Sequence, residues 1–347
     1  MEKKNTLNSI GAANDVAAAR PPSADVSVII PSHNRPQLLQ EALSSVLDQT
    51  IPPAEIIVVD DASDPPITLP ESHSGIKIRL LRIEHCKGGA AAKSLGASAA
   101  KGDLIAFLDD DDLWSPTYLE HAGQLLAHHG DIDVLFMSVD WFGKNKLVSR
   151  QAYLQSIEKL LSVAEGKAIG EGILGFGQEL VPALLQRVPM AFQRPVVRRS
   201  AFQRIGSYHE HCLLWDCDWA LRAALDGKVA LCEAPLYRQR VDNQGYSSQP
   251  TREMEQTRSN IEIRERLANA LDSDDALSRN LRQDFLRSAS QNWFTLAYQL
   301  QLNGDNWTAF KAWIHSQRIA SQPGSLKLLL RILLRKQDRN RYQNQNR

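Results

Sequence analysis

Short runs of apolar residues alternate along the first part of the chain with longer segments in which apolar residues recur every three or four positions. The runs are rich in valine, isoleucine and leucine and end at polar residues, which is typical of buried β-strands, while the longer segments have the spacing of amphipathic helices. Near-continuous apolar strands indicate a parallel sheet covered by helices on both faces. The predicted strands are 26–30, 55–59, 76–83, 104–108 and 133–139, and the predicted helices between them are 36–47, 88–100 and 116–129.

The pattern changes in the second half of the chain. Between 143 and 187 the periodicity loosens, and we interpret this stretch as an insertion with a helix at 151–164, a glycine-rich loop at 166–177 and a further short helix. Periodicity returns at 192–225, and from about residue 251 the spacing is helical only. Four aromatic residues there are spaced as in the core of a packed helical hairpin: Trp293, Tyr298, Trp307 and Trp313.

These patterns divide the chain into three parts. Residues 1–24 are rich in alanine, asparagine and proline without periodicity, so we expect a disordered leader there. Residues 25–250 are predicted to form an α/β domain, interrupted by the insertion at 143–190. Residues 251–347 are predicted to form an all-helical C-terminal region.

Composition narrows the possible classes of protein. The chain has 347 residues, of which 43% are hydrophobic and 23% charged, and this is the usage of a globular protein rather than a disordered or fibrous one. The numbers of basic and acidic residues are both 40, so the formal net charge is zero. A neutral molecule has no overall electrostatic affinity for nucleic acid, and we expect no nucleic-acid partner.

Cysteine spacing and hydropathy indicate the cellular compartment of the protein. The four cysteines have neither the spacing of a zinc site nor that of a redox pair, so we expect reduced thiols. No stretch has the apolar core of a secretion signal or the length of a membrane span. The sequence therefore predicts a cytoplasmic protein that is neither secreted nor membrane-spanning.

Polar residues concentrate where the predicted strands end, which is the edge at which α/β sheets bind ligands. The first strand is followed by Pro-Ser-His-Asn-Arg at 31–35, the second by Asp60 and Asp61, and the fourth by four aspartates at 109–112. Four consecutive carboxylates repel one another in a buried setting, so they require a cation. Oxygen ligands favour Mg²⁺ or Mn²⁺, which keep positions open for substrate phosphates, and the acidic run therefore predicts a metal-bridged diphosphate.

Simpler interpretations of these acids stay open at this point. The run at 109–112 can cap the helix that begins near Pro116, although a cap needs only one or two acids. Asp60 and Asp61 can belong to a turn and have no other role.

Three other nucleotide-binding designs are not supported. The first strand is not followed by the Gly-x-Gly-x-x-Gly sequence of a dinucleotide-binding domain, and the chain contains no Gly-x-x-x-x-Gly-Lys-Ser/Thr sequence. A nucleotidyltransferase would carry a glycine-rich loop with basic residues after the first strand, and that loop is also absent.

Several segments occur together in one order and spacing. They are Val28–Arg35, Ile57–Ser63, Gly88–Gly96 and Phe107–Trp114, followed by Val197–Ser200, Ile205–Glu210 and Trp215–Arg222. In these segments, over roughly residues 25–245, the chain resembles the family 2 glycosyltransferases of GT-A fold. Several ordered motifs together are more specific than any one of them. The resemblance implies a Rossmann-like mixed sheet flanked by helices, followed here by an all-helical C-terminal extension.

The resemblance implies a nucleotide-sugar site. Pro31, His33 and Arg35 would border the base and the ribose, and Asp61 would accept a hydrogen bond from the base. Lys93 stands where the family usually has arginine and would face the diphosphate. Most members have an aromatic residue at the position of His33, whose imidazole can still cover a uracil ring; the alternative is an ordinary surface histidine.

The resemblance also implies a metal site and a catalytic base. Asp109 and Asp110 would lie near the ribose and the metal, and Asp111 would be the direct ligand of Mn²⁺ or Mg²⁺. Arg240 stands where many members have a histidine that helps to hold the metal. Because arginine cannot ligate a cation, it would bind the diphosphate instead. Asp216 resembles the base that deprotonates the acceptor hydroxyl.

One base is enough for the reaction that this resemblance implies. Direct displacement at the anomeric carbon inverts its configuration and needs one carboxylate base and a cation on the departing diphosphate, whereas glycoside hydrolases need a pair of carboxyl groups. Asp216 and Asp218 are two positions apart and would not face each other on a helix, so only Asp216 is assigned to chemistry.

The predicted function is transfer of a sugar from a UDP-linked donor to a saccharide or lipid-linked acceptor, in surface polysaccharide or glycolipid biosynthesis. The insertion at 143–190 would lie on the acceptor side. The alternative is a non-catalytic nucleotide-sugar-binding or scaffold protein, against which the presence of Asp111 and Asp216 argues.

The last segment of the chain is basic and amphipathic. Residues 325–347 contain seven lysines and arginines and one aspartate, hence a local charge of +6, and Lys327, Arg331 and Arg335 recur every four positions among leucines. Such a helix can lie on an anionic membrane, which would allow peripheral contact at the inner face of the cytoplasmic membrane. The alternative is that its apolar face packs on the preceding helices.

Overall fold

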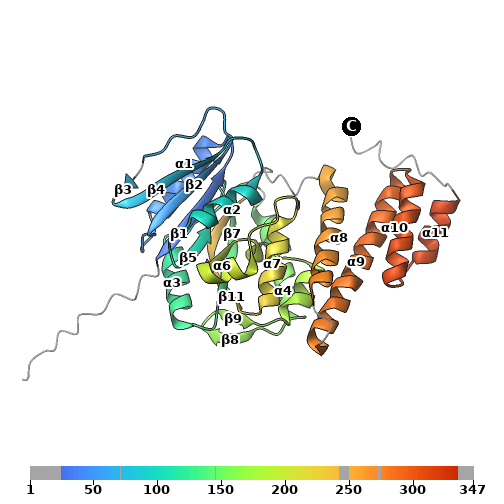
Figure 1. Ribbon diagram of the computed structural model, residues 1–347. Coiled ribbons are helices and arrows are strands. Elements are labelled where there is room, and N and C mark those ends of the chain that lie inside the picture. Colours follow the sequence, from blue (N-terminus) through green and yellow to red (C-terminus); the bar gives the residue numbers. More distant parts are fainter. Residues whose placement is uncertain (1–24, 71, 145, 242–249, 272–274, 335–347) are drawn as a thin grey trace, which may run out of the picture.

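A β-sheet flanked by helices forms the body of the protein, and a bundle of helices extends from it at the C-terminal end (Figure 1). The computed structural model describes residues 25–70, 72–144, 146–241, 250–271 and 275–334. The strands are β1 (Val26–Ser32), β2 (Glu55–Asp61), β3 (Ser72–His73), β4 (Ile76–Ile83), β5 (Leu104–Phe107), β6 (Leu113–Trp114), β7 (Val134–Phe142), β8 (Lys167–Gly170), β9 (Ile173–Phe176), β10 (Pro195–Arg198) and β11 (Val229–Arg240). The helices are α1 (Pro36–Leu47), α2 (Gly89–Ala99), α3 (Tyr118–His128), α4 (Lys146–Leu161), α5 (Leu180–Gln186), α6 (Arg199–Ile205), α7 (Trp215–Asp226), α8 (Glu253–Ala270), α9 (Ala276–Leu302), α10 (Asn306–Ile319) and α11 (Ser325–Leu333), with short 3₁₀ helices at Met190–Gln193 and Pro250–Arg252.

The sheet is mixed rather than uniformly parallel. Its order is β3-β4-β2-β1-β5-β10-β7-β11-β9-β8, and β6 pairs with β11. Strands β4, β2, β1 and β5 are parallel, whereas β10 lies antiparallel to both β5 and β7. The predicted parallel arrangement holds for these four strands and again for β7 and β11, whereas β8, β9 and β10 lie antiparallel to their neighbours. Sequence could not show this difference, because a short buried strand has the same apolar pattern in either direction. The mixed sheet expected from the family resemblance is confirmed.

The segment at 166–177 is a β-hairpin, so the prediction of a loop was wrong. β8 and β9 pair with each other, and β9 pairs with β11. Gly172 makes the turn with a φ angle of +64°, which favours glycine. A Cβ atom on Gly166 would lie 2.8 Å from the Phe176 ring. These glycines therefore mark a tight turn and a close packing contact, which composition alone cannot distinguish from a loop.

Helix α2 packs directly on the parallel half of the sheet. A Cβ atom on Gly96 would lie 2.5 Å from the Ile29 Cγ2 atom of β1 and 3.2 Å from the Val59 Cγ2 atom of β2. The backbone of α2 can approach the sheet this closely only because the side chain is a hydrogen atom. This approach also buries Lys93, one turn earlier on α2, to 1% exposure.

The C-terminal helices belong to two different cores. α8 and the first half of α9 pack on the sheet domain through Ile263, Leu267 and Phe285. The second half of α9 forms a separate apolar cluster with α8, α10 and α11, whose members are Ile261, Leu296, Ala297, Leu300, Ala309, Ala312, Leu328 and Ile332. α9 thus connects the two cores, and the division of the chain at residue 251 stays a prediction.

The aromatic residues of this region do not all contribute to its core. Trp293 and Trp313 pack against the second cluster, as expected. Trp307 is 67% exposed and Tyr298 is 40% exposed, so the expectation was wrong for these two. Helical spacing shows which residues share a face, but it does not show whether another helix covers that face.

The close approach of α2 to the sheet predicts a difference between two glycines. Gly96→Ala should lower the free energy of unfolding by about 1 to 3 kcal/mol, because the added methyl group meets Ile29. Gly123→Ala in α3 is the matched control, since nothing lies within 4 Å of its Cβ position. Alanine there should leave stability unchanged or raise it by up to about 1 kcal/mol. Urea unfolding followed by circular dichroism measures both, and equal effects would contradict this packing.

Candidate active site

Polar residues that follow two parallel strands meet at one edge of the sheet. β1 and β5 are parallel neighbours, so their carboxyl ends lie side by side. The Ser32 hydroxyl donates a hydrogen bond to Asp110 over 2.7 Å, and Pro31 is a partly buried residue of the same strand. Arg35 donates to Asp110 and Asp111 over 3.2 and 2.9 Å. The polar segment after β1 and the acidic run after β5 therefore form one site.

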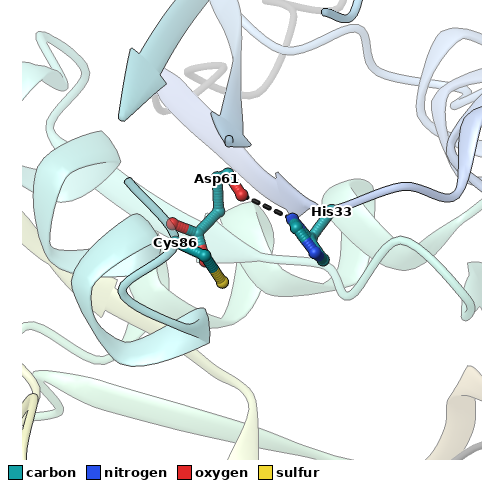
Figure 2. Close-up of side chains that lie close together, drawn as sticks. All are labelled: His33, Asp61 and Cys86. Carbon is teal, nitrogen blue, oxygen red and sulfur yellow. Dashed lines mark hydrogen bonds between the residues drawn. The ribbon is translucent and has the colours of Figure 1, made fainter. Parts of the chain in front are cut away.

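His33, Asp61 and Cys86 lie close together next to the end of β2 (Figure 2). The His33 Nδ1 atom lies 2.5 Å from the carbonyl oxygen of Asp61. The Asp61 carboxylate accepts the backbone N–H groups of Lys87 and Gly88 over 2.8 and 2.7 Å, and it lies 3.3 Å from the Cys86 sulfur. The three ligand atoms lie within 4.8 Å of one another, close enough to share a metal ion. Desolvation and the neighbouring carboxylate raise the pKa of the Cys86 thiol, which favours its protonated form as a hydrogen-bond donor.

The neighbouring Asp60 has a structural role. Its carboxylate accepts the backbone N–H groups of Ser63 and Ile67 over 2.8 and 3.2 Å and pairs with Arg82. These contacts hold the turn after β2. The turn interpretation is thus correct for Asp60, while Asp61 contacts His33 and the segment before α2.

Asp109 is held between two buried cations. The Lys93 Nζ atom lies 2.6 Å from one carboxylate oxygen, and the Arg194 Nη2 atom lies 2.7 Å from the other. Burial alone would raise the pKa of Asp109, but Lys93 and Arg194 outweigh it and hold that pKa well below its ordinary value. Both oxygens of Asp109 are already paired, so of the two predicted metal ligands Asp111 is the more available.

Asp110 and Asp111 fit the divalent metal that the sequence predicts. Burial raises the pKa of Asp110 to about 6; the Ser32 hydrogen bond opposes the rise, and Asp111 adds to it. Burial and the charge of Asp109 likewise raise the pKa of Asp111. Crowded carboxylates whose negative charges are incompletely compensated are an oxygen donor set that a divalent cation stabilises.

The Asp112 carboxylate is held by residues of β11. It accepts hydrogen bonds from the Tyr237 hydroxyl over 2.8 Å and from the backbone N–H of Arg240 over 2.9 Å. Burial raises its pKa to about 7. Asp112 therefore attaches the acidic run to β11. The helix-cap interpretation of 109–112 is wrong, because α3 begins at Tyr118 with Thr117 at its N-cap position.

Arg240 lies beside the acidic run. Its Nε atom donates to the carbonyl oxygen of Asp111 over 2.9 Å, and its Nη2 atom lies 2.5 Å from Glu41. The guanidinium also lies 4.6 Å from the centre of the Phe142 ring. A planar cation thus stands next to the predicted metal ligand, and its binding to a diphosphate stays a prediction.

Asp216 occupies the first turn of α7, and its Oδ1 atom accepts the backbone N–H of Cys217 over 2.8 Å. Burial raises the pKa of its carboxyl group, against the opposing charges of Arg194 and Lys93. The adjacent Trp215 ring lies 4.8 Å from the Lys93 Nζ atom. These electrostatic and ring contacts place Asp216 on the same side of the sheet as the acidic run.

Asp218, two positions further, has a different environment. It is completely buried and pairs with Arg222 of α7 at 3.0 Å and with Arg266 of α8. These ion pairs give Asp218 a structural role, and its absence from the chemistry stays a prediction.

Arg194 is a site residue that the sequence analysis did not identify. Its side chain is 13% exposed, lies against Asp109, and lies 3.7 Å from Asp112. Its guanidinium is 5.5 Å from the centre of the Tyr237 ring. No motif marks this position, since Arg194 simply precedes the short apolar strand β10. Only the antiparallel insertion of β10 beside β5 brings it to the acidic run.

The mixed sheet with its flanking helices has the GT-A fold of glycosyltransferases. Among solved structures, Staphylococcus aureus TarS 1–349 in complex with UDP-GlcNAc is similar with a TM-score of 0.60 and 16% identity, over 88% of this chain and 87% of that one. The mannosyltransferase PcManGT from Pyrobaculum calidifontis, in complex with GDP-Man and Mn²⁺, is similar with a TM-score of 0.51 and 15% identity, over 92% and 83% of the two chains. At these identities the similarity concerns the fold.

The family is shown by sequence. The family model described as Glycosyl transferase family 2 matches residues 27–176. The uncharacterized glycosyltransferase YwdF of Bacillus subtilis is 35% identical over 222 residues, which are 61% of this chain and 73% of that protein. The protein therefore belongs to family 2 of the glycosyltransferases.

Other relatives match over shorter segments. The Escherichia coli protein named UDP-Glc:alpha-D-GlcNAc-diphosphoundecaprenol beta-1,3-glucosyltransferase WfgD is 33% identical over 133 residues, 38% of this chain and 52% of its own. An uncharacterized glycosyltransferase of Haemophilus influenzae is 33% identical over 111 residues, 32% of this chain and 37% of its own. The chain thus spans between about a third and three quarters of these relatives. Within the described ranges, no helix is long and apolar enough to cross a membrane.

The buried position of Arg194 predicts a large effect on stability. Arg194→Gln should lower the free energy of unfolding by about 3 kcal/mol, because the carboxylates of Asp109 and Asp112 lose a buried cation that faces both. Arg204→Gln is the matched control, since the Arg204 side chain is 46% exposed and its partner Asp133 also lies 3.5 Å from Arg198 and from Lys228, so the loss should stay below about 1 kcal/mol. Denaturant unfolding measures both, and equal losses would show that Arg194 is not essential to the charge balance.

Proposed function

We propose that the protein is an inverting glycosyltransferase that transfers a sugar from a UDP-linked donor to a hydroxyl group of a saccharide or lipid-linked acceptor, in surface polysaccharide or glycolipid biosynthesis. The main support is the grouping of Asp109, Asp110 and Asp111 with Arg35, Lys93 and Arg194 and with Asp216 at one edge of the sheet. The TarS complex with UDP-GlcNAc supports a UDP donor, and the name of WfgD supports a lipid-linked acceptor. The cytoplasmic location and the acceptor-side role of 143–190 stay predictions.

In this proposal the base and the ribose lie between Pro31, His33, Arg35 and Asp61. The Asp61 carboxylate is fixed by two backbone N–H groups, so it offers a rigid acceptor for an N–H group of the base. The His33 side chain is exposed, and its imidazole can cover one face of a flat ring. Rigid placement reduces the entropy that the site loses when the nucleotide binds.

The diphosphate would lie over Lys93, Arg240 and a divalent metal held by Asp111, with Asp109 and Asp110 beside it. When bound, Mn²⁺ or Mg²⁺ supplies positive charge to the departing nucleoside diphosphate. Lys93 is fixed by Asp109 and Trp215, so its ammonium group needs little reorganisation when negative charge develops nearby. Arg240 offers a planar guanidinium suited to phosphate oxygens.

Asp216 would take the proton from the acceptor hydroxyl while that oxygen attacks the anomeric carbon. Asp216 is partly buried, and a carboxylate with a raised pKa is a stronger base than a fully exposed one, because burial disfavours its charged form. The hydrogen bond from the Cys217 backbone orients one oxygen, and the ion pairs of Asp218 hold α7 against α8. The carboxylate therefore meets the acceptor in a fixed orientation.

Nucleotide binding and the metal role of Asp111 are tested together. The wild-type protein should gain thermal stability with UDP, and more with UDP and Mn²⁺, because a ligand that binds only the folded state stabilises it. Asp111→Ala should lose most of the Mn²⁺-dependent gain, while Asp131→Ala, an exposed acid elsewhere, should keep it. No stabilisation by any nucleoside diphosphate, together with no transfer from a panel of nucleotide sugars, would favour the non-catalytic scaffold.

Asp216→Asn should reduce the transfer rate by about 10²- to 10⁴-fold and leave the affinity for UDP unchanged, because the amide cannot accept the proton. Asp226→Asn, at the last turn of the same helix, is the matched control and should keep the wild-type rate. For the wild type, the rate should fall at low pH as Asp216 becomes protonated, with a midpoint above the ordinary aspartate pKa, since burial raises the pKa of this group. A wild-type rate for Asp216→Asn would show that another group is the base.

A further inference from the structure

Helix α11 is apolar on two opposite faces. Leu328 and Ile332 are 3% and 4% exposed and belong to the second apolar cluster, so one face docks on α9 and α10. The Trp313 indole N–H also donates to the Ser325 hydroxyl over 2.8 Å and attaches the start of α11. The packing alternative is therefore correct for this inner face, but it accounts for only part of the apolar surface of the helix.

The other face of α11 consists of exposed leucines. Leu326, Leu330, Leu333 and Leu334 are 69%, 49%, 60% and 67% exposed. At about 100° per residue, they lie within about 100° of one another and roughly opposite to Leu328. We call these four residues the outer leucine face. In Figure 1, α11 is the outermost helix of the C-terminal bundle, so this face lies at the far end of the molecule from the sheet domain.

Positive charge borders the outer leucine face. Lys327 and Arg331 are exposed and lie one turn apart at its side. Residues 325–347 carry seven basic residues and one acid. A helix with a continuous apolar face and lysine or arginine beside it is the arrangement that lies in the interface of an anionic bilayer.

We propose that the outer leucine face of α11 docks on an anionic lipid bilayer and holds the glycosyltransferase at a membrane surface. The leucines would enter the boundary between headgroups and acyl chains, while Lys327 and Arg331 contact anionic headgroups. A second copy of this chain is a poorer occupant, because a self-complementary contact would bring the same cations together. The proposal stands whether or not the donor and acceptor proposed above are confirmed.

Vesicle binding tests the proposal with the full-length protein. We expect the wild type to sediment with vesicles of phosphatidylcholine and phosphatidylglycerol at low salt, and to bind pure phosphatidylcholine vesicles at least about tenfold more weakly, since each cation near an anionic surface adds to the affinity. Lys327→Glu/Arg331→Glu should remove most of this preference. No sedimentation with the anionic vesicles, or equal binding to both vesicle types, would overturn the proposal.

Leucine variants test the face itself. Leu326→Gln/Leu330→Gln should lower the apparent vesicle affinity by at least about tenfold, because two exposed apolar side chains are lost. Leu147→Gln/Leu154→Gln is the matched control, since these α4 leucines are 73% and 56% exposed at another surface, and it should bind as the wild type does.

Two further results would contradict the proposal. One is an equal loss of vesicle binding in the control variant, which would mean that exposed leucines act non-specifically. The other is a dimer in size-exclusion chromatography without vesicles that Leu326→Gln/Leu330→Gln dissociates, which would identify a second copy as the occupant. Thermal stabilisation by UDP is measured on the same samples and should be equal in all variants, so a failure of membrane binding is separate from a failure of nucleotide binding.

Discussion

Four consecutive carboxylates at the end of a buried strand repel one another, and cationic side chains from the surrounding structure compensate their negative charges. The cations come from different segments: Arg35 precedes α1, Lys93 lies on α2, Arg194 precedes β10 and Arg240 ends β11. Each arrives through a feature of the fold, such as the close approach of α2 at Gly96 or the antiparallel insertion of β10. The same contacts between distant segments therefore place the site at this edge of the sheet and compensate the negative charges of the acidic run.

The four acids are chemically distinct once these contacts are considered. Asp109 is fully paired and charged, and Asp112 is attached to β11 through Tyr237 and the backbone of Arg240. Asp110 and Asp111 share the single guanidinium of Arg35, and burial raises the pKa of both. The two outer acids fix the run, and the two inner acids retain capacity for a further cation, which would suit the divalent metal proposed above.

The C-terminal helices support the site by holding α7 in place, and they add a second apolar cluster beyond the sheet domain. Asp218 connects α7, which carries the proposed base, to Arg266 of α8, and α9 runs from the sheet core into the second apolar cluster. α11 closes that cluster with one face and leaves leucines exposed on the other. A single chain thus joins a proposed nucleotide site in the sheet domain to a proposed lipid contact on the C-terminal helices, which would suit the lipid-linked acceptor proposed above.

The sequence by itself determined the strands and helices of the first half, the clustering of polar residues at the strand ends, and the family, because these depend on local periodicity and on motifs in a fixed order. Only the tertiary structure decided the direction of β10, the hairpin at 166–177, the role of Arg194 and the separate environments of Asp109 to Asp112. It also decided which face of α11 is covered, leaving Leu326 and Leu330 exposed. Strand direction, charge pairing and burial depend on contacts between segments far apart in the chain, and local sequence patterns do not encode those contacts.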